Sequence, residues 1–235
     1  MSSTNGGGER RAYDFYPTPE WCVHALLREW QPRHCGRWLE PCAGDGAIIR
    51  AVHTFGLAPS WTAVELRSEA FEPISRTAKS ITPNNPPMEI DVHCPENFLL
   101  WKPSEWETGI HGKYDLCLTN PPFLFAQQFI EHSLEMCDQV AMLLRLNFIG
   151  SQERVEWHKK HVADLYPLTP RPGFTEDGGT DSTEYAWWIW PGTGRYKLLD
   201  AVDLRDRWLA EREHCKRKQP VNTDVSELPL FKGAG

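Results

Sequence analysis

The chain has 235 residues, 40% of them hydrophobic, which is enough for one substantial core. Its formal net charge of -7 argues against a protein whose whole surface is a basic nucleic-acid footprint, but leaves room for a local basic cleft. It has no run of about twenty apolar residues and its first residues are polar and glycine-rich, so we expect a soluble protein of the cytosol. The seven cysteines are scattered without a CxxC pair, which predicts reduced thiols and no metal site.

Helical and strand patterns alternate along the chain. With Thr18 as the cap of the first, the apolar spacing predicts helices over 18–30, 47–55, 68–79, 125–137 and 152–163. Shorter apolar runs predict strands over 37–40, 61–66, 88–92, 114–119, 139–144, 166–169 and 185–190. This alternation is typical of a Rossmann-like α/β fold, with a mostly parallel, doubly wound sheet and here an antiparallel last strand. Ligands of such sheets lie at the carboxyl ends of the strands.

Composition divides the chain into four parts. We expect a disordered N-terminal arm at 1–13 and the α/β domain at 14–194. From residue 195 the sequence becomes charged, which predicts a helical extension over 195–218 without a second core, followed by a flexible tail over 219–235.

A glycine-containing turn follows the first predicted strand and is a candidate nucleoside site. The strand ends in Glu40, the turn contains Gly44 and Gly46, and Glu65 ends the next strand. Glycines let the backbone approach a ligand closely, and a carboxylate can accept both hydroxyls of a ribose. The third glycine of the dinucleotide fingerprint is missing, which disfavours NAD.

The segment 39–46 resembles the first cofactor motif of class I S-adenosylmethionine-dependent methyltransferases. The resemblance implies that the turn passes under the methionine part, that Glu65 holds the ribose and that the adenine lies in an apolar slot. The segment 14–19 resembles the motif that closes over the methionine, and 97–99 stands where the family often has an acidic residue before Phe-Leu. The implied cofactor-binding residues are Tyr16, Thr18, Glu40, Pro41, Ala43, Gly44, Gly46, Glu65, Leu66, Asn97, Phe98 and Asn120.

The segment Asn120-Pro121-Pro122-Phe123 follows an apolar strand and suits chemistry on an aromatic amine. Such an amine is a poor nucleophile, because its lone pair is delocalised into the ring. The side-chain oxygen of Asn120 and the carbonyl of Pro121 can accept both amine hydrogens and direct the lone pair at a methyl donor. Pro122 stiffens the backbone, and Phe123 can stack on a base extruded from a helix.

These four residues resemble the catalytic motif of N6-adenine DNA methyltransferases, and 142–145, 171–174 and 181–187 resemble small phage-type members. The resemblance implies that S-adenosylmethionine methylates adenine N6 in double-stranded DNA, with base flipping, in a bacterial or phage-infected cytosol. S-adenosylhomocysteine is then the product. Alternatives are RNA adenine, DNA cytosine N4 or a protein amide as acceptor, a non-catalytic cofactor- or DNA-binding module, and an NAD oxidoreductase. The implied DNA contacts are Arg145, Arg171, Thr180, Asp181 and Ser182.

The C-terminal part carries two weaker signals. Its basic residues can contact phosphates, although a solvated helix accounts for them equally well: Lys197, Arg205, Arg207, Arg212, Lys216, Arg217 and Lys218. The segment 227–231 resembles the peptide by which bacterial replication proteins dock on the sliding clamp. That contact would use Leu228, Leu230 and Phe231, and chance occurrence is the alternative.

Overall fold

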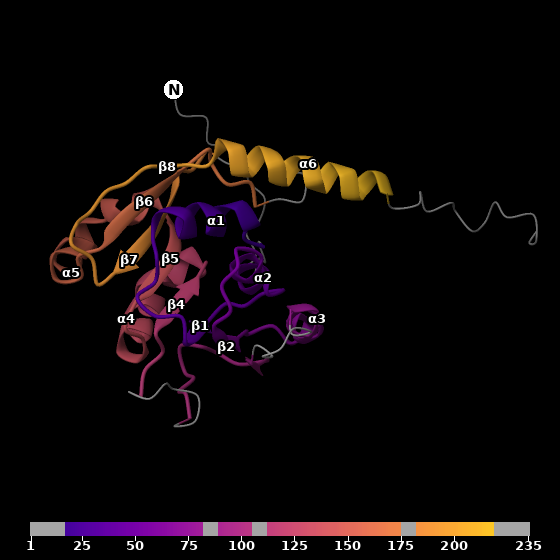
Figure 1. Cartoon of the computed structure of the whole chain (residues 1–235). Coiled ribbons are helices and arrows are strands. Elements are labelled where there is room, and N and C mark those ends of the chain that lie inside the picture. The colour runs from indigo at the N-terminus through magenta and orange to yellow at the C-terminus, as the bar shows by residue number, and fades with distance from the viewer. Residues whose placement is uncertain (1–16, 82–88, 105–111, 175–181, 219–235) are drawn as a thin grey trace, which may run out of the picture.

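Figure 1 shows the computed structural model, which describes residues 17–81, 89–104, 112–174 and 182–218. Eight strands form one sheet in the order β3-β2-β1-β4-β5-β7-β6-β8. They are β1 (Arg37–Glu40), β2 (Ser60–Val64), β3 (Ile90–His93), β4 (Leu116–Thr119), β5 (Val140–Arg145), β6 (Asp164–Thr169), β7 (Tyr185–Trp190) and β8 (Leu199–Asp200). The α-helices are α1 (Glu20–Glu29), α2 (Ala47–Thr54), α3 (Phe71–Ile81), α4 (Ala126–Met136), α5 (Val155–Lys160) and α6 (Val202–Lys218). Short 3-10 turns are η1 (Ser68–Ala70), η2 (Phe123–Phe125), η3 (Leu146–Gly150) and η4 (Gln152–Arg154).

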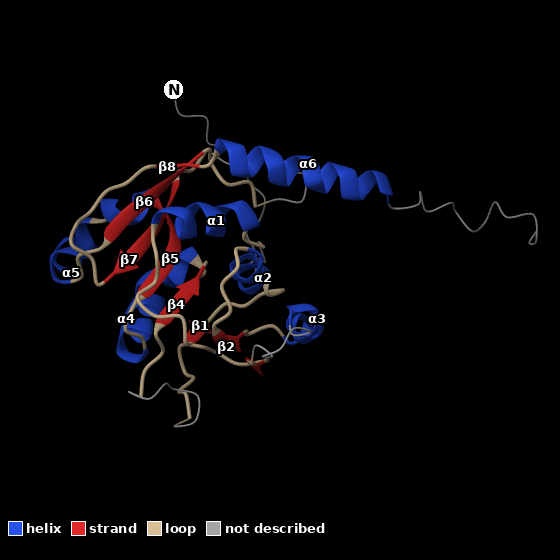
Figure 2. Ribbon diagram, viewed as in Figure 1, coloured by secondary structure: helices blue, strands red, loops and turns tan. Residues whose placement is uncertain are grey.

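The strand directions confirm the predicted fold class. Strands β1 to β5 pair in parallel, whereas β7 lies antiparallel between β5 and β6. Strand β8 then pairs in parallel with β6. The antiparallel strand β7 therefore lies inside the sheet rather than at its edge, because it pairs with β5 on one side and with β6, which precedes it in the chain, on the other. Figure 2 shows this Rossmann-like arrangement of strands and surrounding helices.

Alternating strand side chains divide the core into two layers. Trp38 packs into one cluster with buried residues of α1, α2 and α3, whereas Leu39 faces a second cluster with residues of α4. The same alternation places Leu118 in the first cluster and Cys117 in the second. Burial on both faces is the reason that the central strands read as continuous apolar runs. None of the helices in the described ranges is long and apolar enough to cross a membrane.

The prediction that the C-terminal helix begins at residue 195 was wrong. The helix begins at Val202, because the segment before it runs along β6 and forms β8. Backbone N–H groups of Lys197 and Ala201 donate to carbonyls of β6 at 2.9 and 2.7 Å, and Leu199 is buried in the first cluster. Figure 1 shows α6 extending beyond the rest of the fold.

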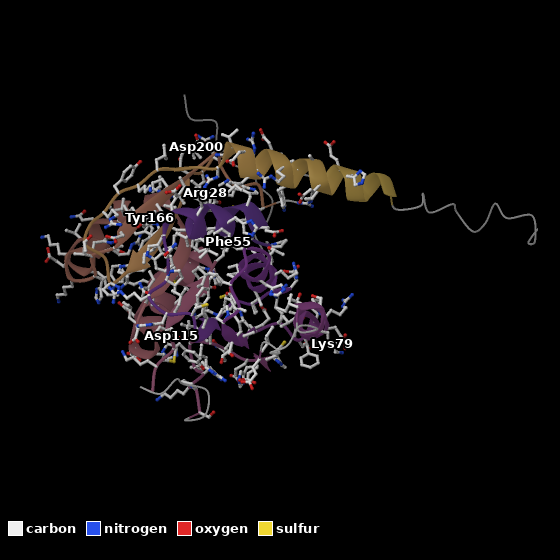
Figure 3. The ribbon with its side chains drawn as sticks, in the orientation of Figure 1. Arg28, Phe55, Lys79, Asp115, Tyr166 and Asp200 are labelled. Atoms are coloured by element: carbon white, nitrogen blue, oxygen red, sulfur yellow. The ribbon has the colours of Figure 1, made fainter. Side chains whose placement is uncertain are left out.

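Ion pairs join the base of α6 to α1. Arg28 Nη1 lies 3.1 Å from Asp203, and its other terminal nitrogen donates to the carbonyl of Asp200. Figure 3 labels Arg28 and Asp200 at this junction. Lys197 Nζ lies 2.5 Å from Glu29 at the end of the same helix. These contacts fix α1, the element that follows the N-terminal part of the candidate site.

Candidate functional site

The glycine turn after β1 has the tight geometry that its sequence predicts. Gly44 and Gly46 have φ angles of 58° and 80°, in the left-handed region that favours glycine. A Cβ added at Gly46 would lie 2.8 Å from Cγ2 of Thr77 on α3, so no larger residue fits without displacement. Helix α2 starts directly after the turn, and Asp45 Oδ1 accepts from the N–H of Ala47 at 3.0 Å.

Two side chains that the sequence analysis missed donate hydrogen bonds to this turn, one from α2 and one from α3. Arg50 on α2 donates to the carbonyl of Asp45 at 2.6 Å and to its carboxylate at 2.7 Å. The hydroxyl of Thr77 donates to the same carbonyl at 2.8 Å. Arg50 carries a local signal, since a charge at i+5 can reach back to the start of its helix. Thr77 carries none, because a contact from a separate helix leaves no spacing pattern.

Glu65 lies beside the turn, where the predicted ribose acid was expected. Its side chain is buried, and Oε2 accepts from the N–H of Gly44 at 2.8 Å. Oε1 accepts from both the backbone N–H and Nε of Arg67 at 2.9 Å. Arg67 is a further residue that the sequence analysis did not identify. The carboxylate is therefore fixed in place against the turn rather than free to rotate.

Glu40 is buried where β1 enters the turn. Its Oε1 accepts from the N–H of Cys42 at 3.2 Å. Burial raises the pKa of Glu40 to about 8, although hydrogen bonds from Thr119 and Cys42 lower it, and the nearby carboxylate of Glu65 adds a smaller rise. This carboxyl group thus takes up and releases its proton close to neutral pH. It would be ionised more readily beside a positively charged ligand.

Asn120 directly follows β4, the strand that neighbours β1, so its side chain and the glycine turn lie at the same edge of the sheet. Its Nδ2 donates to Oγ1 of Thr18 at 3.1 Å. Among the described residues, its Oδ1 is buried without a hydrogen-bond partner. A buried amide oxygen without a donor costs free energy, so this oxygen is a candidate acceptor for a donor on a ligand. Pro121 is buried beside it, and Pro122 is exposed.

Phe123 extends the corner after Asn120 into an aromatic and cationic group. Its ring centroid lies 5.7 Å from that of Tyr185 at the start of β7, and Tyr185 in turn contacts Phe174 at 4.9 Å. The guanidinium carbon of Arg145, at the end of β5, lies 4.8 Å from the Phe123 centroid. Nε of Arg145 is buried and has no hydrogen-bond partner in the described part of the chain. The ends of three adjacent strands therefore meet at Phe123.

The remaining predicted cofactor residues lie near the β2 and β3 ends. Asn97 is exposed and its Oδ1 accepts from the N–H of Leu99 at 3.1 Å, which stabilises the local turn. Phe98 is buried against Phe129 and His132 in the second core cluster. Leu66 is 47% exposed, so its side chain is available to a ligand. Their contact with a cofactor stays a prediction.

The predicted DNA-contacting residues beyond Arg145 are only partly within the described ranges. Arg171 pairs with Glu184 at 2.5 Å, and Ser182 is exposed. Tyr16, Thr180 and Asp181 lie outside the described residues, as do the three residues of the predicted clamp peptide, Leu228, Leu230 and Phe231. Their roles stay predictions.

Comparison with known proteins identifies the fold. No family model and no curated protein sequence matches the chain. Among solved structures, a type I restriction-modification methyltransferase subunit from Streptococcus thermophilus has a TM-score of 0.54 at 14% identity, over 77% of this chain and 45% of that one. A putative RNA methyltransferase from Pyrococcus horikoshii has a TM-score of 0.54 at 13% identity, over 78% and 90% of the two chains. A predicted O-methyltransferase from Agrobacterium tumefaciens has a TM-score of 0.51 at 20% identity, over 77% and 84%.

These likenesses show that the chain has the Rossmann-like fold of the class I methyltransferases. The chain spans less than half the length of the streptococcal subunit. The names of the three structures differ in the substrate they imply, and all identities are low, so the likeness identifies a fold and not a substrate. The substrate has to be argued from the site.

Proposed function

We propose that this chain transfers a methyl group from S-adenosylmethionine to the N6 amine of adenine in DNA, on a nucleotide extruded from the double helix. One observation carries the proposal. Within the part of the chain that the structure describes, the buried Oδ1 of Asn120 has no hydrogen-bond donor, and it lies at the sheet edge that also holds the glycine turn. An amino group on the substrate would supply that donor.

The residues around the turn fit the cofactor. S-adenosylmethionine would supply an electrophilic methyl group on a sulfonium. The Glu65 carboxylate is fixed beside the backbone of Gly44. From this position it can accept hydrogen bonds from ribose hydroxyls if it gives up one of its bonds to Arg67 or to the turn. The buried carboxyl group of Glu40 offers a carboxylate to the positive charges of the methionine part. The close packing of Gly46 against Thr77 holds the backbone of the turn in place.

Asn120 and Pro121 would activate the amine. Oδ1 of Asn120 accepts one amine hydrogen and the carbonyl of Pro121 the other, which returns lone-pair density to the nitrogen. Bound at the turn, the sulfonium would supply its methyl group to this nitrogen and leave as a neutral thioether, and the nitrogen would lose one proton to solvent. Positioning and acceptor strength perform this chemistry, because a neutral amide oxygen takes no proton itself.

The aromatic and cationic group at Phe123 suits an extruded nucleotide. The Phe123 ring can stack on a base, as an enzyme that acts on a buried base atom requires. Arg145 places a permanent positive charge against that ring, and its buried Nε has no acceptor among the residues that the structure describes. A phosphate or a base edge would satisfy it. We therefore propose a nucleic acid rather than a protein amide as acceptor, with Arg171, Thr180, Asp181 and Ser182 as further contacts.

A labelled-cofactor assay tests the proposal. Purified protein is incubated with methyl-labelled S-adenosylmethionine and separate DNA, RNA and protein pools, and the DNA is then digested to nucleosides. We expect label in N6-methyladenine from DNA. Label in RNA, in N4-methylcytosine or in protein would instead support one of the alternative acceptors.

Asn120→Ala separates catalysis from binding. We expect this variant to lose about a hundredfold or more in kcat, the usual cost of removing one group that stabilises the developing charge. Its affinity for S-adenosylmethionine, measured by calorimetry, should be retained. If transfer continues at the wild-type rate, Asn120 does not activate the amine. Cofactor binding without transfer to any pool by the wild-type protein would support a non-catalytic module. The sliding-clamp contact through Leu228, Leu230 and Phe231 remains a separate proposal.

A further inference from the structure

We infer that Thr18 is a positioning residue for Asn120, an inference that rests on the proposed function of that amide. The Thr18 hydroxyl accepts from Asn120 Nδ2 at 3.1 Å, although 102 residues separate the two in sequence. Thr18 is 6% exposed and Asn120 is half-buried, so the contact is partly shielded from water. The bond leaves Oδ1 of the same amide as the group that faces a substrate.

The Thr18 hydroxyl is not used as the helix cap that its sequence position predicts. Pro19 is the N-cap of α1, and no side chain caps this helix. The carbonyl of Pro19 instead accepts from the N–H of Cys22 at 3.0 Å. The capping prediction for Thr18 was therefore wrong, because the rigid proline placed the helix start one residue later. The hydroxyl is left available to the corner after β4.

The chemistry of an amide explains why this contact matters. A hydroxyl can accept from Nδ2 or donate to Oδ1, so Thr18 alone permits either orientation of the amide. The substrate amine selects the orientation in which Oδ1 faces it, and Thr18 then gives Nδ2 a partner. Without the hydroxyl, the reactive orientation leaves Nδ2 as a buried donor with no acceptor. That state is costly, so the amide would turn away from the reactive orientation.

Helix α1 holds Thr18 firmly enough for this role. Trp21, Cys22 and Val23 are buried in the first core cluster. The indole N–H of Trp187 on β7 donates to the carbonyl of Cys22 at 2.9 Å. The ion pairs of Arg28 fix the other end of the helix. A rigid element outside the glycine turn thus holds the hydroxyl that gives Nδ2 a partner in the reactive orientation of the amide.

Two substitutions distinguish positioning from packing. Thr18→Val keeps the shape and removes the hydroxyl, whereas Thr18→Ser keeps the hydroxyl and removes a methyl group. Positioning predicts that Thr18→Val loses about tenfold or more in kcat, as expected for one unsatisfied buried donor, and that Thr18→Ser restores most of the rate. Packing predicts the opposite order, because Ser leaves a small cavity and Val does not.

Binding and stability measurements complete the test. We expect Thr18→Val to keep the wild-type affinity for S-adenosylmethionine and the wild-type unfolding temperature, since the loss concerns only the reactive orientation. A weaker affinity for the cofactor with unchanged kcat would overturn the inference and place Thr18 in the cofactor site. Full activity of Thr18→Val would overturn it as well.

Asn120→Ala, measured in parallel, separates the two proposals. If Asn120→Ala is inactive while Thr18→Val is fully active, only the inference about Thr18 fails. If Asn120→Ala retains its activity, the proposed function of the amide fails, whatever Thr18→Val does.

Discussion

Replacement of Glu40 by glutamine tests whether a protonated carboxyl lies under the glycine turn. Burial, with a contribution from the Glu65 carboxylate, raises the pKa of Glu40 from 4.5 to about 8. Between these pH values the folded chain therefore holds a proton that the unfolded chain has lost. The contribution of Glu40 to stability is complete below about pH 4.5 and is lost as the pH rises to about 8.

The size of the effect follows from the same pKa difference. One pKa unit corresponds to about 1.4 kcal/mol, so a rise from 4.5 to about 8 sets an upper limit of roughly 5 kcal/mol. We expect about half of this limit, because relaxation of the surroundings and entry of water soften the cost of a buried charge. Glutamine stays neutral at every pH, so Glu40→Gln removes this dependence. Any loss from a poorly placed amide would be the same at all pH values.

Guanidinium unfolding between about pH 5.5 and pH 9 measures the effect, with tryptophan fluorescence as the signal. The free energy of unfolding of the wild-type protein should fall relative to Glu40→Gln as the pH rises, and the difference should level off above about pH 8. Glu69→Gln, on the exposed η1, is the matched control and should follow the wild type. A difference between wild type and Glu40→Gln that stays constant over the whole range would refute the reasoning.

Two further predictions concern the turn and the acceptor side. Gly46→Ala should cost roughly 1–3 kcal/mol in unfolding free energy. Gly56→Ala is the control and should cost less, because Gly56 also has a positive φ, 99°, but no atom of the described residues lies within 4 Å of an added Cβ. Equal costs for the two variants would contradict the clash with Thr77. Arg145→Gln should raise the KM for DNA by about tenfold and reduce its salt dependence. Lys113→Gln, at the opposite end of β4, should change neither, and an unchanged KM in Arg145→Gln would exclude a substrate contact.

Local patterns predicted most of the fold and the position of the turn. The apolar run ending in Glu40, the glycines and the following helical spacing specify a strand, turn and helix from neighbouring residues alone. Strand β8 escaped this reasoning, because two residues carry no periodicity. Its formation depends on the backbone of β6, which lies about thirty residues earlier in the chain.

Sequence motifs identified the candidate site residues, but they did not predict the contacts between these residues. The sequence placed Thr18 and Asn120 in separate motifs, one for cofactor and one for catalysis. Their hydrogen bond depends on how α1 docks against the sheet, which no spacing reveals. Arg67 and Thr77 were missed for the same reason, since each supports the site through a partner whose identity only the folded chain defines.

The position of the site follows from the order of the strands. From β1 the chain proceeds to β2 and β3 on one side, whereas β4 is followed by β5 on the other. Connections that leave adjacent strands in opposite directions open a crevice between them at their carboxyl ends. Glu40 ends one of these strands and Asn120 follows the other, so the sheet itself brings a carboxyl group suited to a cation and an amide oxygen suited to an amine to the same crevice. Because Thr18 reaches Asn120 from the segment just before α1, a third element spans this switch point and couples the amide to the helical layer that supports the glycine turn.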